Sequence, residues 1–169
     1  MSSFNIAEKQ QDPNAGANAT RPVAWWPTVR VSDVMSTAVI CVDSLTTVPE
    51  AHQLMKERRI RRLPVIDDGQ LIGIVTLGDI RGALPSEVTT LNRAEQEYLM
   101  KQVKVSRIMH GNVLTVIPET TLVEAARLMV KHKIGGLPVV NPEGNVIGMV
   151  TESDIFNAFV KLFDTFEQV

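Results

Sequence analysis

Residues 63–80 read LPVIDDGQLIGIVTLGDI, and residues 137–155 read LPVVNPEGNVIGMVTESDI. These stretches are parts of a longer internal repeat, in which residues 31–66 align with 105–140 and residues 69–80 align with 144–155. Of the 48 aligned positions, 22 are identical. Self-similarity at a fixed spacing is the signature of a duplicated structural unit. The chain is therefore predicted to contain one unit twice.

Both copies carry the same strand signals. A short apolar run comes first, at residues 39–42 and at 113–117, with the length and β-branched content of a strand. Apolar runs at 63–66 and 71–75 flank a polar turn, and the second copy repeats this pattern between 137 and 150. Each pair of runs predicts a β-hairpin.

Helix signals stand on both sides of each hairpin. Thr-x-x-Glu at 47–50 and at 121–124 fits a capping box, and apolar residues at helical spacing follow it. A second helix is expected to begin near Thr76 and near Thr151. The predicted fold class is α/β, with two β-α-β-β-α units related by approximate internal two-fold symmetry.

The repeat also divides the chain into segments. We expect a polar N-terminal segment that is disordered at first (1–28), unit one (29–83), a connecting helix (84–104), unit two (105–160) and the end of a C-terminal helix (161–169). The connecting segment has Asn92 and Glu95 as a cap. It is either a regulatory insertion or a helix packed on the module.

Composition narrows the functional classes. A formal net charge of −2 provides no global field for nucleic acid or an anionic membrane. No apolar run approaches the roughly 18 residues of a membrane span, and no signal peptide is visible, so we expect a cytoplasmic protein. Three histidines, His52, His110 and His132, lack metal-ligand spacing, and no catalytic motif appears. We therefore predict neither a metal site nor enzyme activity.

The order hydrophobic-Pro-Val, Gly-x-hydrophobic and Val-Thr-x-x-Asp, present twice with matching spacing, resembles the cystathionine β-synthase (CBS) domain. Two such units form what the family calls a Bateman module. With its connecting helix and no catalytic domain attached, the chain is similar to stand-alone bacterial CBS pairs, including those of the acetoin-utilisation type.

The resemblance implies clefts between the repeats that bind AMP, ADP, ATP or S-adenosylmethionine as a regulatory ligand, with no cofactor required. It assigns ribose and phosphate contacts to Thr76, Asp79, Thr151 and Asp154. A carboxylate accepts hydrogen bonds from both hydroxyls of a cis-diol, and a helix N-terminus offers free amides to an anion. The same Thr-x-x-Asp pattern also fits an ordinary helix cap, and the two roles are compatible.

The basic cluster Arg58, Arg59, Arg61 and Arg62 allows three interpretations. A nucleic-acid patch lacks interleaved aromatic residues and supporting charge. A solvated helix end suits the helix dipole. The resemblance adds a third, in which Arg61 and Arg62 contact the phosphates of the ligand.

The resemblance further implies that each cleft draws on both repeats. One cleft would join Thr151 and Asp154 to Arg61, Arg62 and an adenine-facing pair, Ala38 and Ile40. The other would join Thr76 and Asp79 to Gly135 and to an adenine-facing pair of its own, Asn112 and Leu114. Because Gly135-Gly136 replaces the two arginines, we expect this second cleft to lack a cation and the first to hold the phosphate. A self-contained cleft, with the arginines beside Asp79, is the alternative.

The end of the chain is rich in phenylalanine. Four of the five phenylalanines lie in the last 14 residues, at positions 156, 159, 163 and 166, and Trp25-Trp26-Pro27 is a second apolar element. Each either covers the chain's own core or forms a homodimer interface. The leading hypothesis is a homodimeric nucleotide sensor that acts on an unknown output protein. Its rival is a structural or dimerisation protein whose clefts stay empty.

Overall fold

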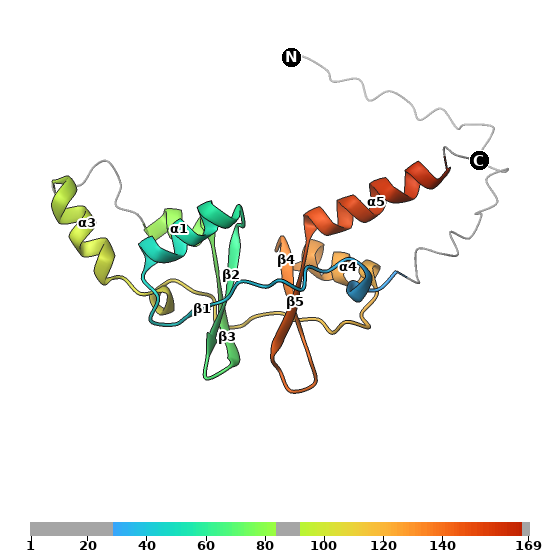
Figure 1. The fold of residues 1–169 in the computed structure, drawn as a ribbon, viewed down its shortest axis with the longest axis horizontal. Helices are drawn as coiled ribbons and strands as arrows, with labels where there is room; N and C mark the ends of the chain where they lie inside the picture. The colour runs from blue at the N-terminus through green and yellow to red at the C-terminus, as the bar shows by residue number, and fades with distance from the viewer. Residues whose placement is uncertain (1–28, 84–91, 167–169) are drawn as a thin grey trace, which may run out of the picture.

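The computed structural model of the chain describes residues 29–83 and 92–166. The polar N-terminal segment and Trp25–Pro27 lie outside the described residues. Two similar halves stand side by side, each with a hairpin and flanking helices (Figure 1). The first half holds β1 (Val42–Asp43), α1 (Val48–Arg58), β2 (Arg62–Asp67), β3 (Gln70–Thr76) and α2 (Leu77–Ala83). The second holds α4 (Leu122–His132), β4 (Gly136–Val140), β5 (Val146–Thr151) and α5 (Glu152–Phe166).

Capping boxes start the first helix of each half, as predicted. The Thr47 N–H donates to Glu50 Oε2 at 2.8 Å and the Glu50 N–H donates to Thr47 Oγ1 at 3.3 Å. Thr121 and Glu124 repeat the arrangement before α4. These bonds satisfy amides that have no partner inside the helix.

The hairpins also form where the apolar runs predict them. In the first, Asp68 and Gly69 connect β2 to β3 with φ of 47° and 80°, the left-handed values that a two-residue hairpin turn of type I′ requires. The strand expected before each first helix is shorter than predicted. Only Val42–Asp43 pairs with β2, and the second half has a single bridge between Val116 and Val139.

These first runs are short as strands because the chain crosses from one half to the other there (Figure 1). A short 3-10 turn, η2 (Val31–Asp33), lies in the second half, where Arg30 pairs with Thr121 and Ser36 pairs with Met149. Its counterpart η3 (Val105–Arg107) lies in the first half, where His110 pairs with Ile74. The two halves have thus exchanged their leading segments.

The exchange places one repeat's side chains in the other repeat's core. Val31 is fully buried in the second core, together with residues of α4, β4 and β5. Val105 is fully buried in the first core, with residues of α1, β2 and β3. Neither core is complete without the segment that the other repeat supplies.

A methionine of each exchanged segment lies directly on a strand glycine. A Cβ atom added to Gly73 would be 2.5 Å from Met109 Sδ, and one added to Gly148 would be 2.5 Å from Met35 Sδ. These glycines therefore serve close packing in a strand.

The two hairpins also contact each other. The half-buried Arg62 crosses from β2 and donates from Nη1 to the Gly135 carbonyl oxygen. A Cβ atom on Gly136 would be 2.5 Å from Arg62 Nη1 and 3.1 Å from the Val150 carbonyl oxygen. The Gly135-Gly136 pair thus makes room for the guanidinium that the first repeat sends across.

The connecting helix α3 (Arg93–Gln102) begins at the predicted cap, where the Asn92 N–H donates to Glu95 Oε2 at 2.9 Å. It contacts α1, but Tyr98 and Leu99 remain exposed. Among residues 29–83 and 92–166, no helix has both the length and the apolar character needed to cross a bilayer.

The Met109–Gly73 contact predicts the effect of a single methyl group. Gly73→Ala should lower the free energy of unfolding by about 1–3 kcal/mol, because overpacking displaces the exchanged segment. Gly82→Ala is the control, since open space surrounds that helical position and the change should not destabilise. Urea unfolding of the parent chain and both variants gives the three free energies of unfolding. Equal values for Gly73→Ala and the parent would contradict the packing role.

The Arg62–Gly136 contact predicts a non-additive pair of substitutions. Gly136→Ala should cost about 1–3 kcal/mol in the parent chain. It should cost about 1 kcal/mol less in an Arg62→Ala background, where the guanidinium no longer competes for the space. Chemical denaturation of the four proteins of this cycle gives the coupling, and additive costs would show that the two residues do not share one site.

Candidate functional site

Two clefts lie between the halves, one at each strand-to-helix junction that follows β3 or β5. The Thr76 cleft has a volume of about 810 Å³ and is bounded by the β3–α2 junction, the crossing segment 110–114 and the start of β4. The Thr151 cleft has a volume of about 370 Å³ and is bounded by the β5–α5 junction, the crossing segment 36–40 and the start of β2. Each cleft therefore contains elements of both repeats.

The Thr151 cleft brings together the whole set of residues that the family resemblance implies for it. Its lining includes the two junction residues, both residues of the adenine-facing pair and both arginines: Ala38, Ile40, Arg61, Arg62, Thr151 and Asp154. Glu152 joins the lining as well. Burial lowers the pKa of Arg62, and the Glu152 carboxylate opposes that effect.

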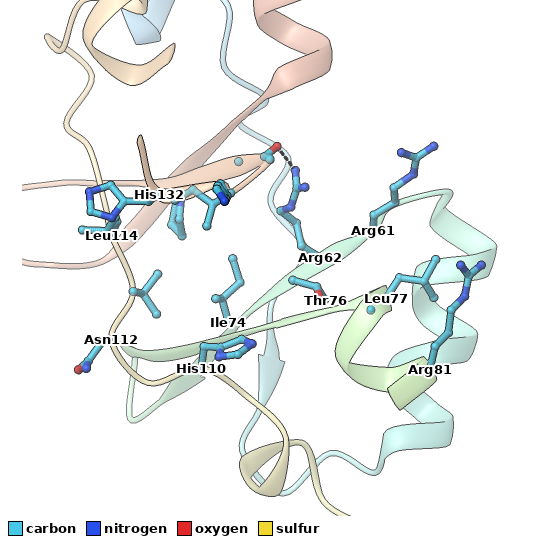
Figure 2. A pocket seen from close by; sticks show the side chains of 17 residues that line it. Arg61, Arg62, Ile74, Thr76, Leu77, Arg81, His110, Asn112, Leu114 and His132 are labelled. Carbon is cyan, nitrogen blue, oxygen red and sulfur yellow. Dashed lines mark hydrogen bonds between the residues drawn. The ribbon is translucent and has the colours of Figure 1, made fainter. Parts of the chain in front are cut away.

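The Thr76 cleft brings together Thr76, Asn112, Leu114 and Gly135. Asp79 lies next to it rather than among its lining residues, joined to the cleft through a contact with His110. Figure 2 shows three arginines at the β3–α2 end, while Asn112, Leu114 and His132 lie at the opposite end.

Both Thr-x-x-Asp patterns form helix caps. The Thr76 N–H and hydroxyl donate to Asp79 Oδ2 at 2.8 and 2.6 Å, and the Thr151 groups donate to Asp154 Oδ2 at 2.8 and 2.7 Å. Partial burial of Asp79 favours its protonated form. Hydrogen bonds from Thr76 and His110 outweigh this and hold the pKa of that carboxyl below its ordinary value. The carboxylate is thus ionised and fixed in orientation.

The expectation that the Thr76 cleft lacks a cation is wrong. Arg81 and Lys133 line it, and Arg61 and Arg62 line both clefts, so the arginines belong to neither cleft alone. Within the described residues, its lining holds no carboxylate, whereas Glu152 and Asp154 line the Thr151 cleft. The larger cleft is therefore also the more cationic one, the reverse of the expected order.

The missed cations come from positions outside the family's pattern. Arg81 is one helical turn into α2, and its counterpart in the other repeat is Phe156, so the repeat gave no signal for it. Lys133 and its counterpart Arg59 end their helices in the left-handed conformation, with φ of 55° and 54°. Each lines a cleft. A basic residue at the same position of both repeats was the available signal.

Comparison with known proteins covers most of the chain. A CBS domain family model matches residues 31–86 and 105–161. A CBS domain-containing protein of Dictyostelium discoideum is 37% identical over 80% of this chain and 94% of its own length. A homoserine O-acetyltransferase of Methanosphaera stadtmanae is 32% identical over 78% of this chain, which spans only 24% of that enzyme.

Solved structures show the same architecture. The CBS domain pair of protein MJ0100, solved with 5′-methylthioadenosine and S-adenosyl-L-methionine, has a TM-score of 0.67, 29% identity and coverage of 80% of this chain and 98% of its own. A Vibrio cholerae protein assigned to acetoin utilization (AcuB) has a TM-score of 0.68 and 30% identity, and the match covers 84% of this chain and 98% of that protein. CBSX2 of Arabidopsis thaliana, solved with AMP, has a TM-score of 0.66 and 30% identity, and the match covers 79% of this chain and 97% of CBSX2. This chain belongs to the CBS domain family and is a tandem CBS pair.

Proposed function

We propose that this CBS pair is a cytoplasmic regulatory module that binds an adenosine-containing ligand between its repeats and transmits binding to another protein. A ligand shifts the arrangement of the halves only by as much as its affinity differs between the arrangements. The clefts suit such coupling because each one is built from both repeats.

One observation carries the proposal: an oriented aspartate stands at a helix N-terminus in or beside each interrepeat cleft. Asp79 and Asp154 are held by Thr76 and Thr151 in the same geometry. An oriented carboxylate matches the cis-diol of ribose. The solved CBS pairs with AMP and with S-adenosyl-L-methionine support an adenosyl ligand for this chain as well.

We further propose that the Thr76 cleft takes the phosphate-bearing nucleotide. Its volume of about 810 Å³ falls within the range typical of small-molecule sites. Arg61, Arg81 and Lys133 line it without an opposing carboxylate among the described lining residues. Charge-assisted bonds to phosphate are stronger than neutral ones. The Thr151 cleft, with two acidic lining residues, suits an uncharged adenosyl group or stays empty.

Removing the aspartates should separate capping from ligand binding. Asp79→Ala should weaken AMP binding at the Thr76 cleft about tenfold or more, since a hydrogen bond to a charged acceptor contributes about 1.5–3 kcal/mol. Glu50→Ala is the matched control. Glu50 caps α1 through Thr47 with the same geometry, but it lines neither cleft. Both variants should lose about 1 kcal/mol of stability.

Isothermal titration calorimetry with AMP, ATP and S-adenosylmethionine measures this, with Asp154→Ala reporting on the other cleft. Equal AMP affinities in the parent, Asp79→Ala and Asp154→Ala would reject the ribose role. No binding and no thermal stabilisation by any adenosyl compound would favour the rival function, a dimerisation protein with empty clefts. A bound ligand at 100 times its Kd should add about 2.7 kcal/mol to the free energy of unfolding.

Homodimerisation is the second part of the proposal. Five apolar side chains on α4 and α5 are exposed and form what we call the α4–α5 surface: Val130, Phe156, Phe159, Val160 and Phe163. The Phe159 and Phe163 rings lie 4.6 Å apart between centroids. Ile155 and Ala158 of α5 pack on the core instead. An apolar surface of this kind is typical of a protein interface.

A charge on this surface should dissociate the proposed dimer. Phe159→Glu or Phe163→Glu should shift the protein from dimer to monomer, because a carboxylate would have to be buried without a partner. Leu45→Glu is the control, since Leu45 is 69% exposed in the first half and outside the surface. Multi-angle light scattering at tens of micromolar checks the mass. A monomeric parent protein would exclude the dimer.

A further inference from the structure

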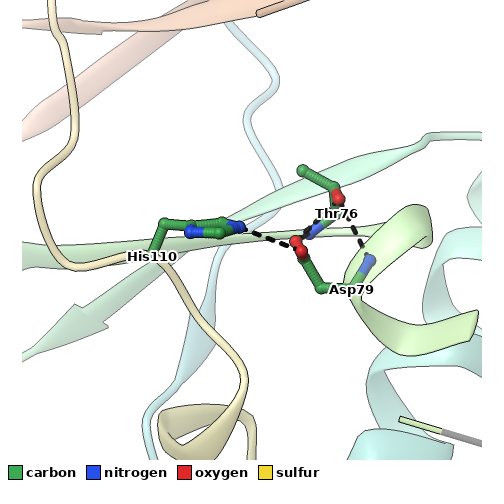
Figure 3. Close-up of polar contacts among 3 residues, drawn as sticks. All are labelled: Thr76, Asp79 and His110. Carbon is green, nitrogen blue, oxygen red and sulfur yellow. Dashed lines mark hydrogen bonds and ion pairs between the residues drawn. The ribbon is translucent and has the colours of Figure 1, made fainter. Parts of the chain in front are cut away.

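The ribose-binding carboxylate of the Thr76 cleft already has a partner on each oxygen. Asp79 Oδ2 accepts from the Thr76 N–H and hydroxyl, while Asp79 Oδ1 lies 2.9 Å from His110 Nε2 (Figure 3). Because the pKa of Asp79 is held low and the group is a carboxylate, the histidine nitrogen is the donor of this bond.

The other cleft lacks this contact. Asp154 Oδ2 accepts the same two bonds from Thr151, but no described residue donates to Asp154 Oδ1. The repeat position of His110 is held by Ser36 there. Both residues have the same backbone pairing. The His110 N–H donates to the Ile74 carbonyl oxygen at 2.9 Å, and the Ile74 N–H donates back at 3.0 Å. The Ser36 N–H donates to the Met149 carbonyl oxygen at 3.0 Å, and the Met149 N–H donates back at 2.9 Å. The difference in the contacts of the two aspartates therefore lies in one side chain.

The acceptor sites on Asp79 are nearly all occupied before a ligand arrives. An ionised carboxylate offers about four lone-pair sites. Thr76 takes two of those on Asp79 and His110 takes a third, which leaves one. A cis-diol that donates from both hydroxyls needs two. The carboxylate beside the Thr76 cleft is thus one site short until the histidine ring leaves, whereas Asp154 keeps two sites.

Building on the proposed function, we propose that His110 is a specificity-determining latch that makes the Thr76 cleft select phosphate-bearing nucleotides over uncharged adenosyl ligands. An uncharged nucleoside that displaces the ring loses the His110–Asp79 bond without compensation. His110 itself lines the cleft, and its side chain is 68% exposed, so the released ring stays available to a ligand. A phosphate on the same sugar gives the released ring N–H a new acceptor and offsets the loss.

The Arg81 and Lys133 side chains contribute to the same discrimination from the cleft wall. They attract a phosphate, but they do not occupy the ribose acceptor. Replacing them should therefore lower the affinity for AMP without raising the affinity for adenosine. Only the latch predicts that a substitution in this cleft improves the binding of an uncharged ligand.

The test compares adenosine with AMP by calorimetry in an Asp154→Ala background, so that the signal comes from the Thr76 cleft. His110→Ser, which copies the other repeat, should raise adenosine affinity about 2- to 5-fold, the lower part of the range for one side-chain hydrogen bond. AMP affinity should stay the same or fall. Ser36→Ala in the same background is the control and should change neither ligand.

A second measurement detects the latch without a ligand. The ring resonances of His110 in an NMR spectrum should shift on Asp79→Asn and stay unchanged on Glu50→Ala. Unchanged adenosine affinity in His110→Ser, or an equal gain for adenosine and AMP, would overturn the latch while leaving nucleotide binding in place. Binding of neither ligand by the parent protein would reject the proposed function itself, and the latch with it.

Discussion

The exchange of leading segments between the repeats is the constraint on which the rest of the structure depends. Val31 and Val105 are each fully buried in the core of the opposite repeat. Each half alone would expose a strand face and lose the contact of a methionine on Gly73 or Gly148. Because the chain must cross between the halves twice, residues 36–40 and 110–114 run past the opposite strand-to-helix junctions and close the two clefts. Cleft formation is therefore a consequence of how the cores are completed.

Symmetry of the backbone and asymmetry of the side chains have different roles in this chain. The repeated backbone places an oriented aspartate at both junctions, as Asp79 and Asp154 show. Three divergent positions then make the clefts unequal. Arg62 crosses onto a glycine pair, Arg81 adds a cation to the larger cleft, and His110 contacts Asp79 Oδ1 beside that cleft. One duplicated backbone can thus carry two clefts of different charge and contacts without changing its fold.

Local patterns predicted most of the fold, because capping and hairpin turns depend on residues close in sequence. The Thr47 and Thr121 caps and both hairpins lie where the sequence predicts them. The first strands were overestimated because a crossing segment has strand composition but pairs only briefly. The cations of the Thr76 cleft were missed for a related reason. Arg81 and Lys133 enter the cleft from separate helices, and only the basic residue that Lys133 shares with Arg59 in the repeat gave a signal.

We propose that AMP binds between the repeats, in the Thr76 cleft first. The most direct measurement is an AMP titration followed by amide chemical shifts in ¹H–¹⁵N NMR spectra. We expect the earliest changes at Thr76, Asp79, Asn112 and Leu114, which come from both repeats and lie in or beside the Thr76 cleft alone. Changes that begin at Ala38, Ile40 and Thr151 instead, or an unchanged spectrum at millimolar AMP, would contradict it.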